Sequence, residues 1–208
     1  MKKLIFTLMI MIGSFASAEL NNVNPDPNGE PWLAGGWKMP DAEEMKTIRA
    51  IPELTLPESY RTKELPYKID NSELQYFRPI FNQSGGSCAQ ASGVGYNFTY
   101  QMNFLNGTDA SLSPNQFPTH YTYNFLNDGS GANGSTYFAG WDIISAGGIP
   151  DVPTYGGLWP ATDSDKIWMD GFINYRSGMH RRALEVQAIP VDTPEGLETL
   201  KQYFNDYC

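Results

Sequence analysis

Cys88 has the clearest chemical potential in this sequence, because it follows a glycine-rich turn and opens a stretch with the pattern of a helix. The first turn of a helix has N–H groups without intrahelical partners and about half a positive charge. A thiolate is stabilised there and becomes a nucleophile near neutral pH. The same N–H groups, with the side-chain amide of Gln83 just upstream, are suited to hold an oxyanion. Cys88 and Gln83 therefore predict acyl transfer through a cysteine, which still requires a general base.

Residues 88–105 predict the long helix that positions this cysteine. Apolar residues recur there at steps of three and four, which makes one face of a helix: Ala91, Val94, Phe98, Met102 and Leu105. Ser87 is the expected N-cap and Gly107 the expected C-terminal stop. Gly93 and Gly95 would weaken the helix unless they are buried against close neighbours.

Other segments predict the surrounding elements. Residues 41–50 predict a short helix, with Asp41 as N-cap and Glu44 at the third helical position. Residues 136–146 predict a second helix, ended by two glycines. The aromatic residues of 121–125 are expected to pack in the core.

Near the C-terminus, residues 184–189 alternate apolar and polar side chains and predict a strand. Thr193-Pro194-Glu195 has the N-cap, first-turn proline and acidic residue that begin a helix. Its buried face is expected to consist of Leu197, Leu200 and Phe204.

Several segments also follow the order found in one enzyme family. They are residues 65–70, 78–83, 112–116, 132–135, 138–155 and 191–204. Together with Cys88 after its Gly/Ser turn, this ordered set resembles the papain-like cysteine peptidases, over residues 65–208. The resemblance implies an α+β fold, with a helical lobe followed by a β-barrel-like lobe, and hydrolysis of peptide bonds in a peptide or protein substrate. It implies no metal and no organic cofactor.

The resemblance also implies roles for individual residues. Cys88 would be the nucleophile and Gln83 an oxyanion-hole donor, while Asn133, Gly134 and Ser135 would lie along the cleft that pairs with an extended substrate. The sequence also departs from the family near these residues, and the turn lacks the family's second cysteine. Four residues instead of five separate Gln83 from Cys88, Ala89 replaces a tryptophan, and Ser135 replaces a glycine.

The family's catalytic His and Asn follow the cysteine by about 130–150 residues, which places them beyond residue 208. The two histidines present are His120, where the family has no catalytic group, and His180, beside two arginines. One strand of the second lobe is expected, at 184–189. We therefore expect the peptidase domain, residues 65–208, to be incomplete at its C-terminus and this chain alone to be inactive.

Residues 1–18 have the basic end, the apolar run and the small-x-small site of a secretory signal peptide. Residues 19–64 form an irregular, propeptide-like leader. The protein is expected to be secreted or periplasmic, with no membrane span after cleavage. Its net charge of −9 argues against nucleic acid as a partner.

Two other functions remain open. The chain could be a non-catalytic, secreted peptide-binding module on a degenerate peptidase scaffold, or another cysteine acyl-transferase such as an amidase. Cys88 could then be a buried structural thiol, or pair with Cys208. His180 is the alternative base.

Overall fold

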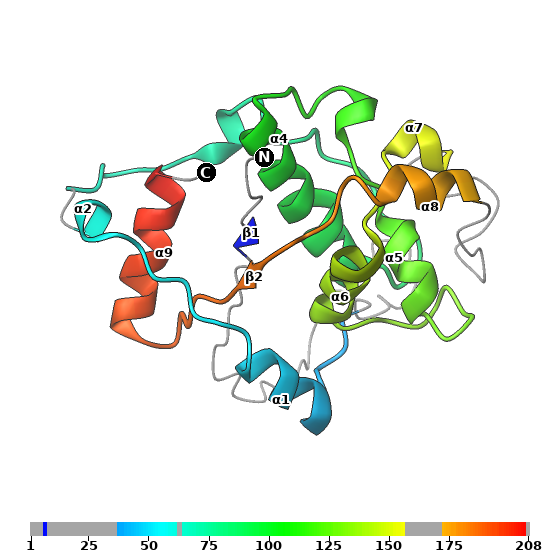
Figure 1. The fold of residues 1–208 in the computed structure, drawn as a ribbon, viewed down its shortest axis with the longest axis horizontal. Helices are drawn as coiled ribbons and strands as arrows, with labels where there is room; N and C mark the ends of the chain where they lie inside the picture. The colour runs from blue at the N-terminus through cyan, green and yellow to red at the C-terminus, as the bar shows by residue number, and fades with distance from the viewer. Residues whose placement is uncertain (1–5, 8–36, 62–63, 157–171, 207–208) are drawn as a thin grey trace, which may run out of the picture.

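The computed structural model describes residues 6–7, 37–61, 64–156 and 172–206, and these are mostly helical (Figure 1). The helices are α1 (Ala42–Arg49), α2 (Glu58–Arg61), α3 (Cys88–Gln90), α4 (Thr99–Asn106), α5 (Thr119–Leu126), α6 (Tyr137–Gly147), α7 (Val152–Tyr155), α8 (Phe172–Gly178) and α9 (Pro194–Asp206). Two 3₁₀ turns, Asn71–Glu73 and Ser113–Asn115, and a π-helical stretch η2 (Ala91–Phe98) join them. The two strands are β1 (Phe6–Thr7) and β2 (Val186–Gln187).

Helices α3, η2 and α4 follow one another without a break and form what we call the central helix, as predicted for 88–105. It ends at Gly107, whose φ of 65° is left-handed. The predicted capping role of Ser87 is wrong, because its hydroxyl donates to the Ser84 carbonyl at 2.8 Å and caps no N–H group. The predicted apolar stripe is buried except for Leu105, which is 38% exposed.

The two glycines of the central helix, which would weaken it if they were not buried against close neighbours, are buried against aromatic rings. A Cβ on Gly93 would lie 3.1 Å from the ring of Tyr137, and one on Gly95 would lie 2.8 Å from the ring of Phe81. At Gly95 the helix therefore approaches its neighbour more closely than a residue with a Cβ would allow without a shift, and at Gly93 the approach is nearly as close.

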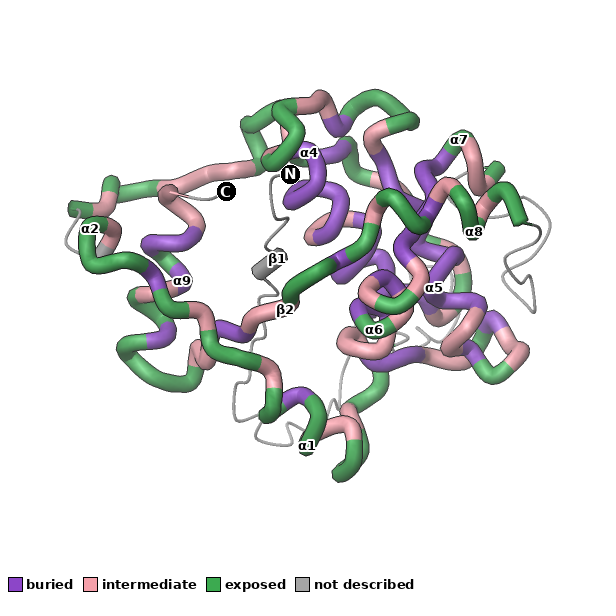
Figure 2. Tube along the Cα trace, viewed as in Figure 1, coloured by how far each residue is buried: buried purple, intermediate pink, exposed green. Residues whose placement is uncertain are grey.

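The main core lies between the central helix, α5 and α6, and Figure 2 shows the central helix and α5 as mostly buried chain. Phe98 makes edge-to-face contacts with Phe117 at 4.9 Å and Trp141 at 5.9 Å. Tyr121 and Tyr123 are at most 1% exposed, so the prediction that this aromatic stretch packs in the core is confirmed.

Residues 37–61 pack onto this body, although the sequence presents them as a leader. Helix α1 has the predicted capping box, in which Asp41 accepts from the Glu44 N–H and Glu44 accepts from the Asp41 N–H. Ile48 is buried in the main core. Leu54 donates to the Ala188 carbonyl at 2.8 Å, and Ala188 donates to the Pro52 carbonyl at 2.8 Å.

Extended structure is scarce in the described residues. Strand β2 occupies only two residues of the predicted 184–189 strand and pairs in parallel with β1. The barrel-like sheet of the expected α+β fold is absent from the part of the chain that the structure describes. The expected signal peptide, residues 1–18, lies outside the described residues apart from β1.

Helix α9 begins as predicted, with the Thr193 hydroxyl accepting from the Gly196 N–H at 3.0 Å. Its predicted buried face is partly wrong, because Leu197 is 44% exposed while Tyr203 is 5% exposed. A second, smaller group of buried residues holds α9, and we call it the α9 cluster: Leu56, Ile189, Leu200 and Tyr203. No helix among the described residues combines the length and hydrophobicity needed to cross a membrane.

Candidate active site

Cys88 is half-buried at the start of the central helix, directly after the turn that the sequence predicts. Gly85 adopts a left-handed φ of 61°, which lets the chain reverse before the helix begins. The Ala91 N–H donates to the Ser87 carbonyl at 2.8 Å and closes the first helical turn. The alternative disulfide with Cys208 involves a residue outside the described range.

Contacts on both sides of Cys88 bring residues 131–136 next to the nucleophile. Before it, the Gly86 N–H donates to the Gly131 carbonyl at 2.7 Å. A Cβ on Gly86 would collide with the Asn133 carbonyl, so only glycine fits there. After it, the Gln90 amide donates to the Ser135 hydroxyl at 3.1 Å and to the Thr136 carbonyl at 2.8 Å. Cys88 and the predicted cleft residues Asn133, Gly134 and Ser135 are therefore neighbours.

Hydrogen bonds to the Tyr123 hydroxyl hold the loop that contains the predicted cleft residues. The Tyr123 hydroxyl lies 2.6 Å from the Asn133 carbonyl and 2.9 Å from the Gly131 carbonyl. The Asn133 amide donates to the Asn127 carbonyl at 2.9 Å. These bonds hold the backbone of the loop in one position relative to the turn before Cys88.

Gln90 is a positioning residue that the sequence analysis missed. It is 0% exposed, and its amide oxygen accepts from the Thr122 hydroxyl at 2.9 Å while its nitrogen bonds the 135–136 backbone and side chain. A buried glutamine must find such partners, because an unsatisfied amide is costly. In the sequence, the only indication of this role is that Gln90 lies two residues after Cys88.

Arg78 was also missed as a structural residue, since a charged side chain is expected at the surface. It is 2% exposed, and it donates to the Gly95 carbonyl at 3.1 Å and to the Gln116 side chain at 3.2 Å. Its guanidinium lies 4.1 Å from the Phe81 ring centroid. Burial lowers the pKa of Arg78 to about 10, so it stays charged at neutral pH. It attaches the segment leading into the Cys88 turn to the central helix.

Gln83, the predicted oxyanion donor, is exposed on this turn. Its side-chain amide donates to the Gly85 carbonyl at 3.4 Å, within the same turn. That bond is long, so little energy opposes rotation of the amide toward a ligand.

Ser135 already pairs with an extended piece of chain. Trp37 forms a parallel bridge with it, and the Lys38 N–H donates to the Ser135 carbonyl at 2.9 Å. The pairing continues through side chains, since the Thr136 hydroxyl donates to Glu44 at 3.0 Å. The predicted cleft segment is therefore paired, through the Ser135 carbonyl, with an extended segment of the same chain.

Neither histidine in the described residues is placed as an evident partner for the thiol. His120 is 0% exposed, both its ring nitrogens lack a hydrogen-bond partner, and its ring packs edge-to-face on Tyr123 at 5.2 Å. Burial lowers the pKa of His120 to about 4, so the imidazole is neutral near pH 7. His180 is exposed just after α8.

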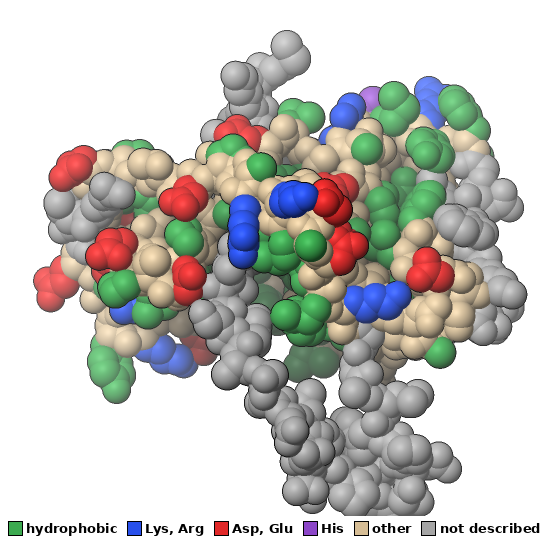
Figure 3. Space-filling view, turned by 90° about the horizontal axis from the view of Figure 1, so that it is seen from below, with side chains coloured by type: hydrophobic (Ala, Val, Ile, Leu, Met, Phe, Trp, Pro, Cys, Tyr) green, Lys and Arg blue, Asp and Glu red, His purple; other side chains and the backbone are tan. Residues whose placement is uncertain are grey.

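No group of three or more His, Cys, Asp or Glu side chains among the described residues could hold a metal ion. On the face shown in Figure 3, basic side chains are scattered among acidic ones and form no continuous patch. Comparisons with protein-family models, curated proteins and solved structures found no match.

Proposed function

We propose that the protein is a papain-like cysteine peptidase lobe, secreted or periplasmic, in which Cys88 is the nucleophile. The observation that carries the proposal is the position of Cys88. It begins a long, mostly buried helix, next to a segment whose Ser135 already bonds an extended backbone. Both features fit attack on a peptide bond, because the helix end favours a thiolate and the segment aligns the substrate.

In the proposed reaction the Cys88 thiolate attacks the peptide carbonyl and an S–C bond forms. The oxyanion of the tetrahedral intermediate is stabilised by N–H groups of the first helical turn and by the Gln83 amide after it rotates. The C–N bond then breaks, the leaving amine takes a proton from solvent water, and a thioester remains. Water hydrolyses the thioester, which releases the acid and regenerates the thiol.

A second candidate is a peptide-binding module that performs no chemistry. The histidines favour it, because His120 is sealed in the core and His180 is exposed beyond α8. In this case the backbone bonds of residues 133–135 would hold a peptide, and Cys88 would be an ordinary thiol.

Alkylation kinetics distinguish the peptidase from the peptide-binding module. The purified chain is treated with a thiol-directed peptidyl epoxide, and mass spectrometry reports labelling at each cysteine. The peptidase proposal expects saturable labelling at Cys88, at least ten-fold faster than that of free cysteine at pH 7. Cys88→Ala is the control, because only Cys208 then remains to react.

Labelling of Cys88 no faster than that of free cysteine would overturn the proposal that the start of the central helix activates Cys88 as a nucleophile. Binding of an unreactive peptide of the same sequence, together with such slow labelling, would support the binding module. Gln90→Leu serves as a matched variant, because it leaves the thiol in place but removes the bonds to Ser135 and Thr136. It should slow labelling at Cys88 if the alignment of residues 133–135 matters.

A further inference from the structure

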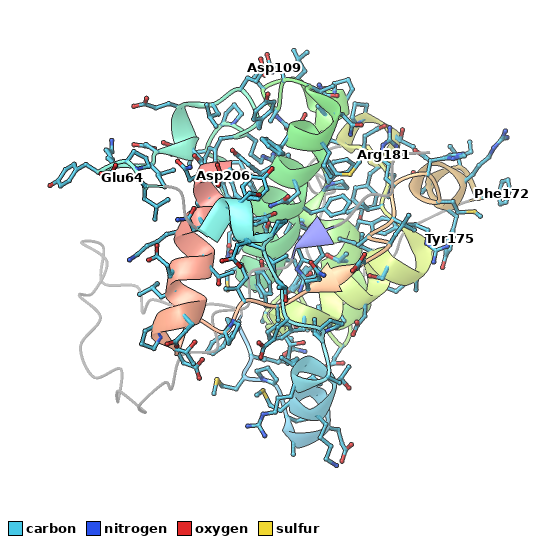
Figure 4. All side chains as sticks on the ribbon, turned by 60° about the vertical axis from the view of Figure 1, so that its left-hand side comes forward. Glu64, Asp109, Phe172, Tyr175, Arg181 and Asp206 are labelled. Carbon is cyan, nitrogen blue, oxygen red and sulfur yellow. The ribbon has the colours of Figure 1, made fainter. Side chains whose placement is uncertain are left out.

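Helix α8 presents its large apolar side chains to solvent, whereas a surface helix ordinarily turns them toward the core. Its exposed side has four apolar side chains and one charged one, and we call it the α8 face: Phe172, Ile173, Tyr175, Arg176 and Met179. Phe172 and Ile173 are 76% and 75% exposed. In Figure 4, Phe172 and Tyr175 lie at the edge of the molecule and point away from it. Exposed apolar side chains grouped in this way are typical of an interaction surface.

The inner side of α8 consists of small residues that pack closely, so the orientation of the helix is fixed. Gly178 is buried, and its carbonyl accepts from the Arg181 N–H at 2.7 Å. A Cβ on Gly148 would collide with the same carbonyl. The Arg181 guanidinium donates to the Ser177 hydroxyl at 3.1 Å and forms an ion pair with Asp151 at 2.8 Å. Packing on the inner side therefore holds the apolar side chains outward.

The charges on and beside the α8 face are positive. On the side of the molecule seen in Figure 3, basic side chains mostly lie among acidic ones, but residues 172–184 contain three arginines and no Asp or Glu. Arg176 lies beside Phe172, because residues four apart share one face of a helix. Arg182 is exposed, and its guanidinium donates at 2.9 and 2.7 Å to the Ser145 carbonyl, a neutral acceptor that leaves its charge uncompensated.

The nearest acidic residues along the chain do not lie on the α8 face. Asp170 is outside the described residues. Glu185 is on the segment that leads from α8 to β2, away from the helix in Figure 1. Among the described residues, the α8 face therefore combines apolar side chains with positive charge, which is the combination that suits an anionic lipid surface.

The size of the α8 face favours a membrane over a protein as its partner. Seven residues of helix are only about 10 Å long, whereas a stable protein interface takes about 20–30 residues from each side. A few apolar side chains that enter the boundary between headgroups and acyl chains need no such area. Arg176 can keep its stem among the apolar side chains while its guanidinium reaches the phosphates. Tyr175 has the amphipathic ring that is enriched at membrane interfaces.

We propose that the α8 face binds the surface of a membrane that contains anionic phospholipids. Phe172 and Ile173 enter the headgroup region, and Arg176 and Arg182 pair with lipid phosphates. The net charge of −9 does not prevent this contact, because at physiological salt charges more than about 8 Å away are largely screened. The α8 face lies outside the proposed catalytic machinery, so its binding to lipid does not depend on Cys88.

Flotation with lipid vesicles tests the proposal. Vesicles of phosphatidylglycerol and phosphatidylcholine, mixed one to two, are compared with vesicles of phosphatidylcholine alone. The protein is used as the cell releases it, with its N-terminus checked by mass spectrometry, because the apolar run of residues 4–15 would itself bind lipid. Binding to the anionic vesicles should be at least about ten-fold tighter than binding to the neutral ones, and added salt should weaken it.

Variants separate the apolar contribution from the charged one. Phe172→Ser combined with Ile173→Ser should weaken binding to anionic vesicles at least about ten-fold. Ile80→Ser is the matched control, because Ile80 is 89% exposed elsewhere, and it should leave binding unchanged. Arg176→Gln should weaken binding to anionic vesicles about five-fold, whereas Arg49→Gln, at an exposed arginine of α1, should not. Circular dichroism checks that each variant is folded.

Three outcomes would overturn the proposal. The first is that the folded protein binds neither kind of vesicle. The second is that it binds both kinds equally and Arg176→Gln changes nothing, and the third is that Ile80→Ser loses as much binding as the double variant. If the protein ignores vesicles but self-associates in sedimentation velocity, and the double variant abolishes this, the α8 face is an interface between copies of the chain instead. None of these results bears on labelling at Cys88, so either proposal can fail without the other.

Discussion

The two sides of the central helix differ in how they are packed. On the α5 and α6 side, the main core is continuous, and the Gln90 amide finds partners for both its oxygen and its nitrogen inside it. On the α9 side, the α9 cluster is small, and the Tyr203 hydroxyl reaches the central helix through a bond to Gln101 at 3.1 Å. The central helix is therefore packed more extensively on its α5 and α6 side than on its α9 side.

The largest expected effect is in the main core. Trp141 is 2% exposed and contacts Phe98, so Trp141→Ala should lower the free energy of unfolding by about 3–5 kcal/mol. Urea denaturation measures this loss. Phe172→Ala is the control, because Phe172 is 76% exposed and should change stability by less than about 0.5 kcal/mol. Similar losses in both variants would contradict the packing described for α6.

A smaller and more local effect is expected in the α9 cluster. Leu200→Ala should cost about 2 kcal/mol, the low end for a buried leucine, because few neighbours surround it. Hydrogen exchange should accelerate in α9 and in residues 54–60, while the central helix keeps its protection. Equal acceleration in the central helix would show that the two sides form one cooperative unit.

Acidic pH tests the main core through His120. Its pKa is about 4 in the folded protein against 6.5 ordinarily, so the unfolded chain binds the proton first as the pH falls. The stability that this group contributes is complete above pH 6.5 and is lost as the pH falls toward 4. The slope is at most about 1.4 kcal/mol per pH unit.

Urea midpoints of the wild type and His120→Leu, measured from pH 7 to pH 4.5, isolate this contribution. The variant should be less sensitive to acid over that window. Identical pH dependence in the two proteins would mean that His120 is not the buried neutral group described above.

The smallest expected effect concerns the N-terminal segment that pairs with Ser135. Asp41→Ala removes the N-cap of α1 and should cost about 1 kcal/mol. Because α1 is joined to Thr136 through Glu44, exchange at the Lys38 N–H should also accelerate. Glu43→Ala is the matched control, since its exposed ion pair with Lys46 contributes little. Unchanged exchange at the Lys38 N–H would show that the N-cap of α1 does not stabilise the pairing with Ser135.

Local signals predicted most of the helix ends, although the predicted N-cap at Ser87 was wrong. The capping box at Asp41, the Thr193 cap and the left-handed Gly107 depend on residues close in sequence, so their geometry could be read directly. Which face of a helix is buried depends on distant neighbours. For that reason Leu197 was wrongly expected inside, where Tyr203 lies instead, and Leu105 is exposed.

In the candidate site, too, some features could be predicted from the sequence and others could not. The placement of Cys88 followed from its turn, and its proximity to residues 133–135 was expected only through the family resemblance. Gln90, which makes that proximity specific, is polar and would ordinarily be expected at the surface. Its role depends on Thr122 and Ser135, 32 and 45 residues away, and no local pattern records such partners.

The π-helical stretch Ala91–Phe98 lies between the nucleophile and the rest of the central helix. Such stretches hold extra residues relative to an α-helix, in which each residue advances by about 100°. Eight residues of this looser winding turn through nearly the same angle as about seven residues of α-helix. Deleting one residue here, with a return to α-helical winding, would therefore leave the direction of Cys88 almost unchanged. The same deletion in α4 would rotate Cys88 by about 100° relative to the chain that follows and away from the Ser135 segment, so labelling at Cys88 should tolerate the first deletion better than the second.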